Sequence, residues 1–331
     1  MAALLDNAID PKGRIRDVSN TFIMLRVEEC PVTSMAKKGP KPKSSLYEWR
    51  IKGKHTPTDS AIADGVDVQD SEIINNESLK YTAQGRTQKG RVVVGVSDVA
   101  EELGDEYAVN GGLVADNLMD GLIMARENME LSLLKNSNSA PYTDSSNPMK
   151  MRGLTYWARS SNAANGDLPV PTGALTPAAN IVSGKAAATD VTEENFISIL
   201  QGIATASRKM HNLHVFATPA MRVRLSSLTK FTPANSTDLL TRRFNQTDLK
   251  AITMTVERME CDFGKFFLHT HFSLPSGVHA LLIDMDMIQM RNTRNPTAQK
   301  LPYLGGVRKT MIEYIMGLEV SNPQTIGKIT T

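Results

Sequence analysis

The stretch of sequence that decides the fold is TMIEYIMGLEVSNPQTIGKI, residues 310–329. Its first half alternates between apolar and other residues, as a β-strand with one buried face does. The apolar positions are Ile312, Tyr314, Met316, Leu318 and Val320. Glu313 and Glu319 fall on the opposite face, with Gly317 between them. The pattern predicts a half-buried strand near the end of the chain, where order usually fails. The partners of this strand must be sought earlier in the sequence.

The composition is ordinary for a globular protein. The chain has 331 residues, enough for two domains or one large domain with insertions. Aromatic residues make up only 5% and there are 17 Met, so we expect aliphatic, adaptable cores. The net charge of +2 is too balanced to imply a nucleic-acid or membrane protein by itself.

The sequence shows no sign of export or membrane insertion. Cys30 and Cys261 lie far apart, which argues against a disulfide scaffold and fits a reducing compartment. The first residues, MAALLDNAIDPKGR, do not have the basic start and apolar run of a signal peptide. There is no stretch of about 18 apolar residues. We therefore expect no membrane partner and a protein that stays in the cytoplasm where it is made.

The first hundred residues predict an arm followed by a long hairpin. Residues 1–45 have no packing period and should be ordered only by contact with something else. LYEWRIK (46–52) and LKYTAQGR (79–86) alternate as strands do, and RVVVGVS (91–97) extends the second of them. The connection between them, residues 53–78, is long and polar, and such loops tend to be functional.

The charges of this region are segregated along the chain. Residues 35–54 carry seven basic side chains and one acid, Glu48, which gives +6, whereas residues 55–78 carry six acids and no Lys or Arg, which gives −6. Two interpretations stay open: two solvated loop faces, or complementary surfaces on neighbouring copies that steer a salt-sensitive assembly. The second gives these candidate inter-subunit residues: Lys37, Lys38, Lys41, Lys43, Trp49, Arg50, Lys52, Lys54, Asp59, Asp64, Asp67, Asp70 and Glu72.

A long amphipathic helix follows. Apolar residues recur at steps of three and four at Leu118, Leu122, Ala125, Met129 and Leu133. From Val109 to Leu134 such a helix would be roughly 39 Å long at 1.5 Å per residue. We expect it to be a spine across which other elements pack.

The rest of the chain mixes strands and helices without a regular βαβ alternation. Residues 137–192 are rich in loops. A helix is expected at 193–209 with Thr192 as its N-cap, and another from Pro219. A strand followed by a turn is expected at 214–221, and further strands at 249–259, 265–272 and 279–290. The fold class is therefore α+β.

A search for catalytic chemistry yields one weak candidate. His269 and His271, two residues apart on one strand, could join Asp284 and Asp286 in a metal site, but an exposed polar strand face explains them better. For His211 and His214 we expect capping or solvent contact. Asp262-Phe263-Gly264 matches the kinase triplet without the other kinase motifs and is interpreted as a turn. The sequence has no nucleotide-binding, hydrolase or zinc-protease motif, so we expect no catalytic residues, no cofactor and no enzyme.

Three segments match one known arrangement of elements. MECDFGKFFLHTHFSLPSGVHALLIDMDMIQMRN (259–292) resembles a strand, a D-F-G turn, a strand, and a strand that ends near an Arg. LPYLGGVRKTMIEYIMGLEVSNPQTIGKI (301–329) resembles a Glu-containing strand, an Asn-Pro turn and a last short strand. GRVVVGVSDVAEEL (90–103), the long helix and MKMRGLTYWA (149–158) complete the pattern. The chain thus resembles the tailed-bacteriophage major capsid proteins of the HK97 fold, and within them the SU10-like group.

This resemblance implies a division of the chain into domains. Residues 1–45 would be the N-terminal arm and 46–96 the extended hairpin, or E-loop. Residues 97–150 and 306–331 would form a peripheral domain with the spine helix, and 151–305 an axial domain. The last strand would return to the peripheral domain and close it.

The resemblance also implies a function and partners. The protein would assemble into hexamers and pentamers of an icosahedral shell around double-stranded DNA, which it would contact non-specifically. Because only about 45 residues precede the hairpin, a separate scaffolding protein is expected, with a portal and a decoration protein as further partners. The location would be the virion, after assembly in the cytoplasm of the bacterial host. No motif supports a covalent cross-link from Lys52, Lys54 or Lys80.

Two alternatives remain open at the level of sequence. One is an encapsulin-type compartment that holds protein cargo. The other is a metal-dependent enzyme built on His269, His271, Asp284 and Asp286.

Overall fold

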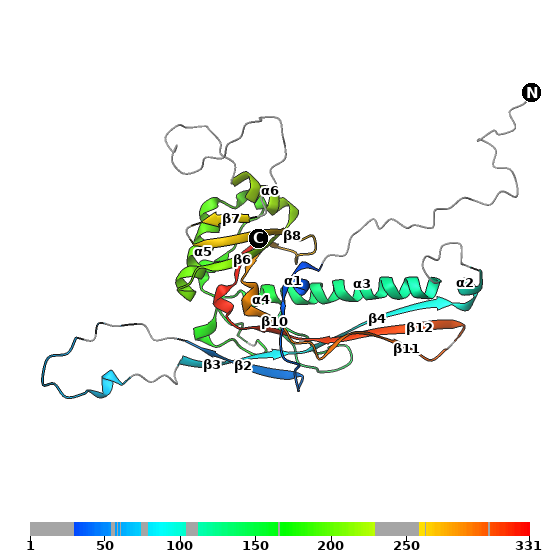
Figure 1. The fold of residues 1–331 in the computed structure, drawn as a ribbon, viewed down its shortest axis with the longest axis horizontal. Coiled ribbons are helices and arrows are strands. Elements are labelled where there is room, and N and C mark those ends of the chain that lie inside the picture. The colour runs from blue at the N-terminus through cyan, green and yellow to red at the C-terminus, as the bar shows by residue number, and fades with distance from the viewer. Residues whose placement is uncertain are drawn as a thin grey trace, which may run out of the picture.

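A computed structural model gives the fold of the chain and describes residues 30–53, 57, 59, 61–73, 79–103, 112–164, 166–228, 258–261, 263–303 and 305–331. A long helix and long strands lie side by side and extend to one side of the molecule, and a two-stranded hairpin points the opposite way (Figure 1). Between them lies a body of strands and helices. Among the described residues, no helix is both long and apolar enough to cross a membrane.

The C-terminal stretch passes through three sheets in turn. Its strands are β12 (Val307–Met316), β13 (Leu318–Val320) and β14 (Gly327–Thr330). β12 lies between β11 (Arg294–Lys300) and β4 (Gln88–Ser97), β13 pairs with β10 (Ile288–Met290), and β14 lies between β5 (Ile181–Val182) and β9 (Val278–Ile283). The predicted strand is confirmed. Because the stretch continues as three strands in three different sheets, it connects parts of the protein that one strand alone could not connect.

The two faces of this stretch differ in how they are covered. The five alternating apolar side chains that define its predicted inner face are at most 3% exposed. Glu313 and Glu319, predicted on the polar face, are also buried, at 7% exposure each. Glu313 accepts from Lys89 Nζ at 2.6 Å, and Glu319 is paired with Arg291. These cations from the same subunit cover the second face, and Lys89 holds the pKa of Glu313 below its ordinary value.

The spine helix α3 (Leu113–Leu134) packs along the long sheet formed by β11, β12 and β4. Its 22 residues give a length of roughly 33 Å. Ala125, Met129 and Leu133 are buried, as predicted. Gly121 allows close contact, since a Cβ there would lie 2.7 Å from Val94. The end at Leu134 is as predicted; residues 109–111 of the predicted helix lie outside the described part. A short helix, α2 (Asp98–Leu103), was not predicted.

The predicted hairpin is confirmed for its first two strands, but the prediction that residues 91–97 extend it is not. β2 (Leu46–Lys52) pairs with β3 (Lys80–Arg86) in an unbroken antiparallel register. The extension to residues 91–97 is wrong, because β4 pairs with β12 over ten consecutive residues. Alternation shows which face of a strand is buried, but it does not show which strand lies beside it.

A six-stranded sheet forms most of the body. Its order is β5, β14, β9, β6 (His211–Ala217), β8 (Gly264–Thr270) and β7 (Arg258–Cys261). Helices α5 (Glu193–Ser207) and α6 (Pro219–Leu228) share one apolar core with it. Thr192 caps α5 as predicted, since its Oγ1 accepts from Asn195 N at 3.3 Å. Of the strand predicted at 249–259, only the last two residues lie in the described part, where they begin β7.

The loop-rich region contains only short elements, as expected. They are α4 (Leu154–Trp157), η4 (Thr172–Ala174), η5 (Ala178–Asn180), β5 and η6 (Ala188–Asp190). Elsewhere in the described ranges the short 3₁₀ helices are η1 (Asp70–Glu72), η7 (Met285–Met287) and η8 (Pro323–Thr325).

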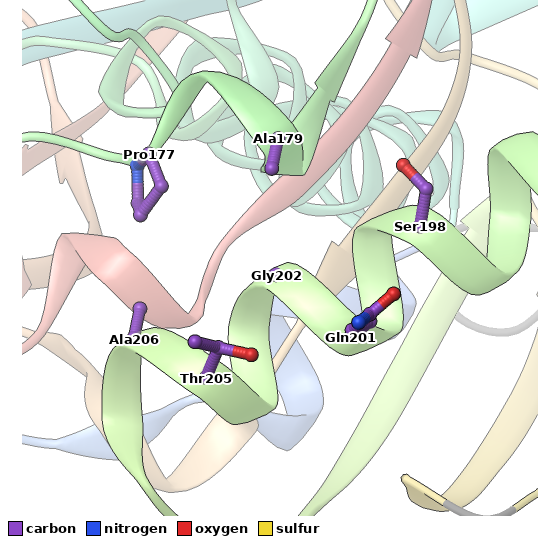
Figure 2. A pocket seen from close by; sticks show the side chains of 7 residues that line it. All are labelled: Pro177, Ala179, Ser198, Gln201, Gly202, Thr205 and Ala206. Atoms are coloured by element: carbon purple, nitrogen blue, oxygen red, sulfur yellow. The ribbon is translucent and has the colours of Figure 1, made fainter.

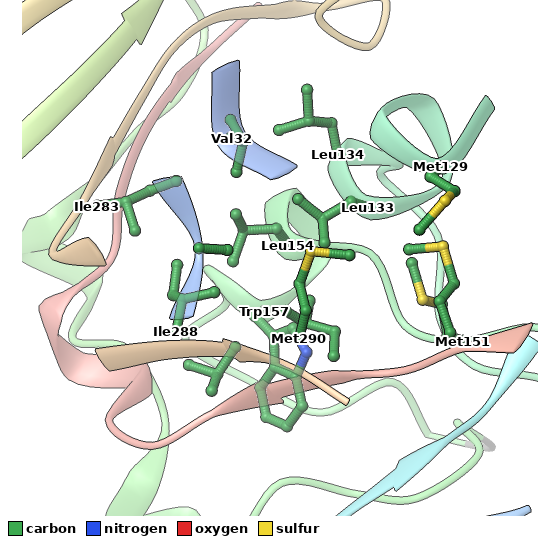
Figure 3. Packing of buried hydrophobic residues seen from close by; sticks show 14 of the residues in the cluster. Val32, Met129, Leu133, Leu134, Met151, Leu154, Trp157, Ile283, Ile288 and Met290 are labelled. Carbon is green, nitrogen blue, oxygen red and sulfur yellow. The ribbon is translucent and has the colours of Figure 1, made fainter. Parts of the chain in front are cut away.

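A second core lies where the arm, the spine helix and the body meet. The arm contributes α1 (Pro31–Met35) and β1 (Lys37–Lys38), which pairs with β10 in parallel. Figure 3 shows Val32 of α1 in the same cluster as Leu134 of the spine helix and Ile283 of β9. The described part of the arm is thus packed against its own subunit.

Candidate assembly surfaces

The base of the hairpin is fixed to the body by two aromatic side chains. Tyr47 Oη donates to the carbonyl of Leu318 at 2.8 Å, and Trp49 Nε1 donates to that of Val320 at 3.0 Å. The ring of Trp49 also contacts Trp157, with centroids 5.7 Å apart. Gly317 makes room, because a Cβ there would lie 2.6 Å from Tyr47 Oη. Burial raises the pKa of Tyr47 above its ordinary value.

This anchoring corrects one predicted site residue. Trp49 was expected to contact a neighbouring copy, but it is only 7% exposed within its own subunit. Burying the indole while pairing its N–H is worth more than leaving it on the surface. Trp49 therefore fixes the hairpin on β13 and is removed from the candidate contacts.

A second anchor joins β3 to the loop after α4. Arg86 Nε donates to Asp167 Oδ2 at 2.7 Å, and its Nη2 donates to Oδ1 at 3.0 Å. Arg152 donates to the carbonyl of Asp167 at 3.0 Å and lies 4.5 Å over the ring of Trp157. Burial lowers the pKa of Arg152 to about 10, so it stays charged at neutral pH. Both strands of the hairpin are thus attached to the body at their base.

We expect Asp167→Asn to weaken this anchor in a pH-dependent way. Arg86 holds the pKa of Asp167 below its ordinary value, so the pair stabilises the fold above the unfolded pKa of about 3.9. This stabilisation is lost as the pH falls through the lower, folded pKa. Urea unfolding should show a loss of about 1–2 kcal/mol at pH 7 that shrinks near pH 3. An equal loss at both pH values would contradict the assignment; Asp120→Asn, an exposed acid on α3, is the control.

The far end of the hairpin is an acidic tip, defined as Asp59 and residues 61–73. All of its predicted acids are exposed: Asp59, Asp64, Asp67, Asp70 and Glu72. Between them lie four aliphatic side chains that are 54–82% exposed: Ile62, Val66, Val68 and Ile73. The tip has no Lys or Arg. Exposed apolar groups gathered on a projecting segment are typical of a binding surface.

The basic candidates lie on two other surfaces. Lys37, Lys38, Lys41 and Lys43 are exposed along the arm, and we refer to them as the arm lysines. Arg50 and Lys52 are exposed on the outward face of β2, while Lys54 lies outside the described residues. Lys37 Nζ contacts Asp286 Oδ1 at 2.9 Å, and both side chains remain more than half exposed. The acidic tip projects away from α1 and β10 (Figure 1), so one subunit does not bring its own tip and arm together.

The residues of the candidate metal site each have a different partner. His269 Nε2 lies 3.0 Å from His214 Nδ1, and Asp284 Oδ2 lies 2.6 Å from His211 Nδ1. His271 contacts a buried acid of the spine helix, Glu130, and Asp286 contacts Lys37. Within the described ranges, no three His, Cys, Asp or Glu side chains are arranged to hold a metal ion. The four residues do not form the common ligand set that the enzyme alternative requires.

The two neighbouring histidines also differ from expectation. His211 is buried and paired with Asp284, so a capping or solvent role is wrong for it. His214 stacks on His269 with centroids 5.2 Å apart, and burial lowers the pKa of both imidazoles. The pair is part of a row of stacked rings on β6 and β8.

A cavity of about 380 Å³ lies beside α5. In Figure 2, Pro177 and Ala179 face the helix across it. The other lining residues are Ser198, Gln201, Gly202, Thr205 and Ala206. These lining residues include no acidic side chain and no His, Lys, Arg or Cys.

Comparisons with known proteins agree with this architecture. The model of the SU10 major capsid protein family matches residues 5–331. No curated protein sequence matches the chain.

Solved structures show the same fold at low sequence identity. The chain is similar to the capsid asymmetric unit of Cyanophage A-1(L), with a TM-score of 0.61, 14% identity, and coverage of 98% of this chain and 99% of that one. It is similar to the capsid of an empty GTA particle, with a TM-score of 0.61, 11% identity and 99% coverage of both chains. For a chain of Gordonia phage Cozz the TM-score is 0.55, with 14% identity and coverage of 96% and 91%. These similarities confirm the α+β fold of the HK97 type, and, because the family model spans nearly the whole sequence, the chain belongs to the SU10 major capsid protein family.

Proposed function

We propose that this structural capsid protein assembles by placing the acidic tip of one copy on basic residues of a neighbouring copy. The observation that carries the proposal is the acidic tip itself. It projects from a hairpin whose base is anchored to the body, and it exposes aliphatic side chains beside its acids. The arm lysines supply the opposite charge on a surface from which the same subunit's tip projects away, and Arg50 and Lys52 add positive charge on the outward face of β2.

The physical chemistry favours contact between copies. A two-stranded hairpin is marginally stable in water, and a neighbouring surface would hold its far end. Complementary charges fix register and speed encounter, while the aliphatic groups add apolar burial. Each contact is weak, but symmetry repeats it across the shell. We infer closed icosahedral shells of hexamers and pentamers around double-stranded DNA.

We propose revised domain boundaries from the sheet pairings. The extended hairpin would be 46–86 rather than 46–96, and β4 would belong to the peripheral domain with α3, β11 and β12. The axial domain would contain the six-stranded sheet, including β14. The closing stretch would then complete both domains, not the peripheral domain alone.

Family membership places the protein in the virion and gives it a structural role. We propose that it has no enzymatic activity and is assembled in the host cytoplasm. A separate scaffolding protein, a portal and a decoration protein remain proposed partners, as does non-specific contact with packaged DNA. The family match favours a phage capsid over an encapsulin-type compartment.

Assembly should depend strongly on salt. We expect the purified protein, with its scaffold if one is needed, to form closed shells or hexamers and pentamers near 0.1 M salt. These should dissociate near 1 M salt, where the Debye length falls from about 10 Å to about 3 Å. Negative-stain electron microscopy and size-exclusion chromatography at both concentrations measure this. Shells that form equally well at both salt concentrations would contradict charge pairing.

A further inference from the structure

One acid of the spine helix is buried without being part of any proposed assembly surface. Glu130 is 1% exposed. Its Oε1 accepts from Val32 N at 2.9 Å, and its Oε2 accepts from Thr33 N at 2.7 Å. Oε2 also accepts a hydrogen bond from Thr33 Oγ1. The carboxylate thus binds the first turn of α1, nearly one hundred residues earlier in the chain.

A histidine from the body, His271, completes the site, and its own contacts show which ring nitrogen carries the proton. Ser273 N donates to His271 Nδ1 at 3.1 Å, so that nitrogen carries a lone pair and the proton is on Nε2. His271 Nε2 then donates to Glu130 Oε1 at 3.2 Å. Glu130 therefore accepts hydrogen bonds from both the arm and the body. It joins three segments: the arm, the spine helix and the loop after β8.

The short helix α1 depends on this carboxylate. A helix leaves the amides of its first turn unpaired, and a cap from its own sequence normally satisfies one of them. The side chain of Cys30, at the N-cap position of α1, does not cap the helix. Glu130 provides the cap from another element. Because a five-residue helix is not stable by itself, α1 should persist only while it is bound.

The other described contacts of the arm are mainly apolar or backbone contacts. Val32 and Ala36 are buried in the second core, Met35 packs against it, and Pro42 is buried. β1 makes two residue pairs with β10, and Gly39 N donates to the carbonyl of Met290 at 2.9 Å. The contact of Lys37 with Asp286 is exposed and adds little. The buried, charge-assisted bonds to Glu130 are the strongest polar contacts in this set.

We propose that Glu130 is a latch that holds arm residues 30–43 on the spine helix, and that opening it frees this segment as a unit while the body stays folded. The arm then has two states, docked and released. Since the arm lysines follow α1 directly, the latch determines where these four charges lie relative to the body. The latch is a property of the single subunit and does not depend on the proposed assembly contact.

Hydrogen exchange on the full-length subunit tests the latch. In Glu130→Gln the amide nitrogen replaces one acceptor oxygen and faces a donor from Val32, Thr33 or His271. We expect exchange in peptides covering residues 31–36 to speed up about 10- to 100-fold. Exchange in β6 and β9 should not change. Asp120→Asn, which removes an exposed carboxylate from the same helix, should change neither.

A second variant keeps the test decisive if Glu130→Gln does not fold. Thr33→Val removes one donor from the arm side and leaves the spine helix and His271 intact. It should speed exchange in the same peptides by a smaller factor. Unchanged exchange at residues 31–36 in a folded variant, or equal acceleration of arm and body, would overturn the proposal.

Discussion

Removal of residues 311–331 is expected to leave no soluble folded protein. The deletion takes away the part of the chain that pairs with β4, β11, β10, β9 and β5. It also removes seven apolar side chains that are at most 3% exposed: Ile312, Tyr314, Met316, Leu318, Val320, Ile326 and Ile329. At about 1.5–3 kcal/mol for each buried side chain, the seven together contribute about 10–20 kcal/mol, which is as large as or larger than the 5–15 kcal/mol by which a typical domain is stable.

The deletion is measured by soluble yield, circular dichroism and size-exclusion chromatography. Replacement of residues 61–73 by a short Gly-Ser linker is the matched control, because the described side chains of this segment are exposed. That variant should fold normally. A monodisperse truncated protein with a native spectrum would show that the closing stretch is dispensable.

Reversal of three charges in the acidic tip is expected to abolish assembly without unfolding the subunit. The triple variant Asp64→Lys, Asp67→Lys and Asp70→Lys changes the net charge of the tip by +6 and turns attraction to the arm lysines into repulsion. Since all three carboxylates are exposed, the melting temperature should stay within about 2 °C of the wild-type value. Electron microscopy of assembly reactions and thermal unfolding of the subunit give the two readouts.

A compensating variant separates charge pairing from a general defect. Lys38→Glu, Lys41→Glu and Lys43→Glu together reverse the arm and leave the contact of Lys37 with Asp286 intact. Each triple variant alone should fail to form shells, and the two combined should recover them at least in part. Normal shells from the tip variant alone would refute the pairing.

The sequence predicted where helices and strands lie better than it predicted which of them lie side by side. The alternation in 312–320 identified every buried apolar side chain of that stretch, and Thr192 identified the start of α5. Alternation could not show that β4 lies beside β12, because the pairing spans more than 200 residues of chain. It also could not show that Glu313 and Glu319 would be covered by Lys89 and Arg291.

The same holds for the candidate assembly surfaces: features that are local in the sequence were predicted, and those that depend on distant contacts were not. The exposed acids and lysines were found because local charge is visible in the sequence. Trp49 was placed on the wrong surface, because its apolar face could have met either a neighbour or its own β13. Glu130 was missed because the apolar stripe of the helix, which ends with Met129 and Leu133, did not include it. The buried Leu134, one turn after Glu130, is the signal that the buried face is wider.

Zero-length cross-linking of assembled shells tests the central claim most directly. Shells are formed from an equal mixture of ¹⁴N- and ¹⁵N-labelled subunits and treated with a carbodiimide, which joins carboxylates to amines in contact. We expect cross-links between Asp64, Asp67 or Asp70 and the arm lysines, with half of them joining one light and one heavy peptide. Cross-links from these acids only to other surfaces would contradict the pairing of tip and arm. Cross-links in which both peptides always carry the same isotope would show that the contact lies within one subunit and would contradict pairing between copies.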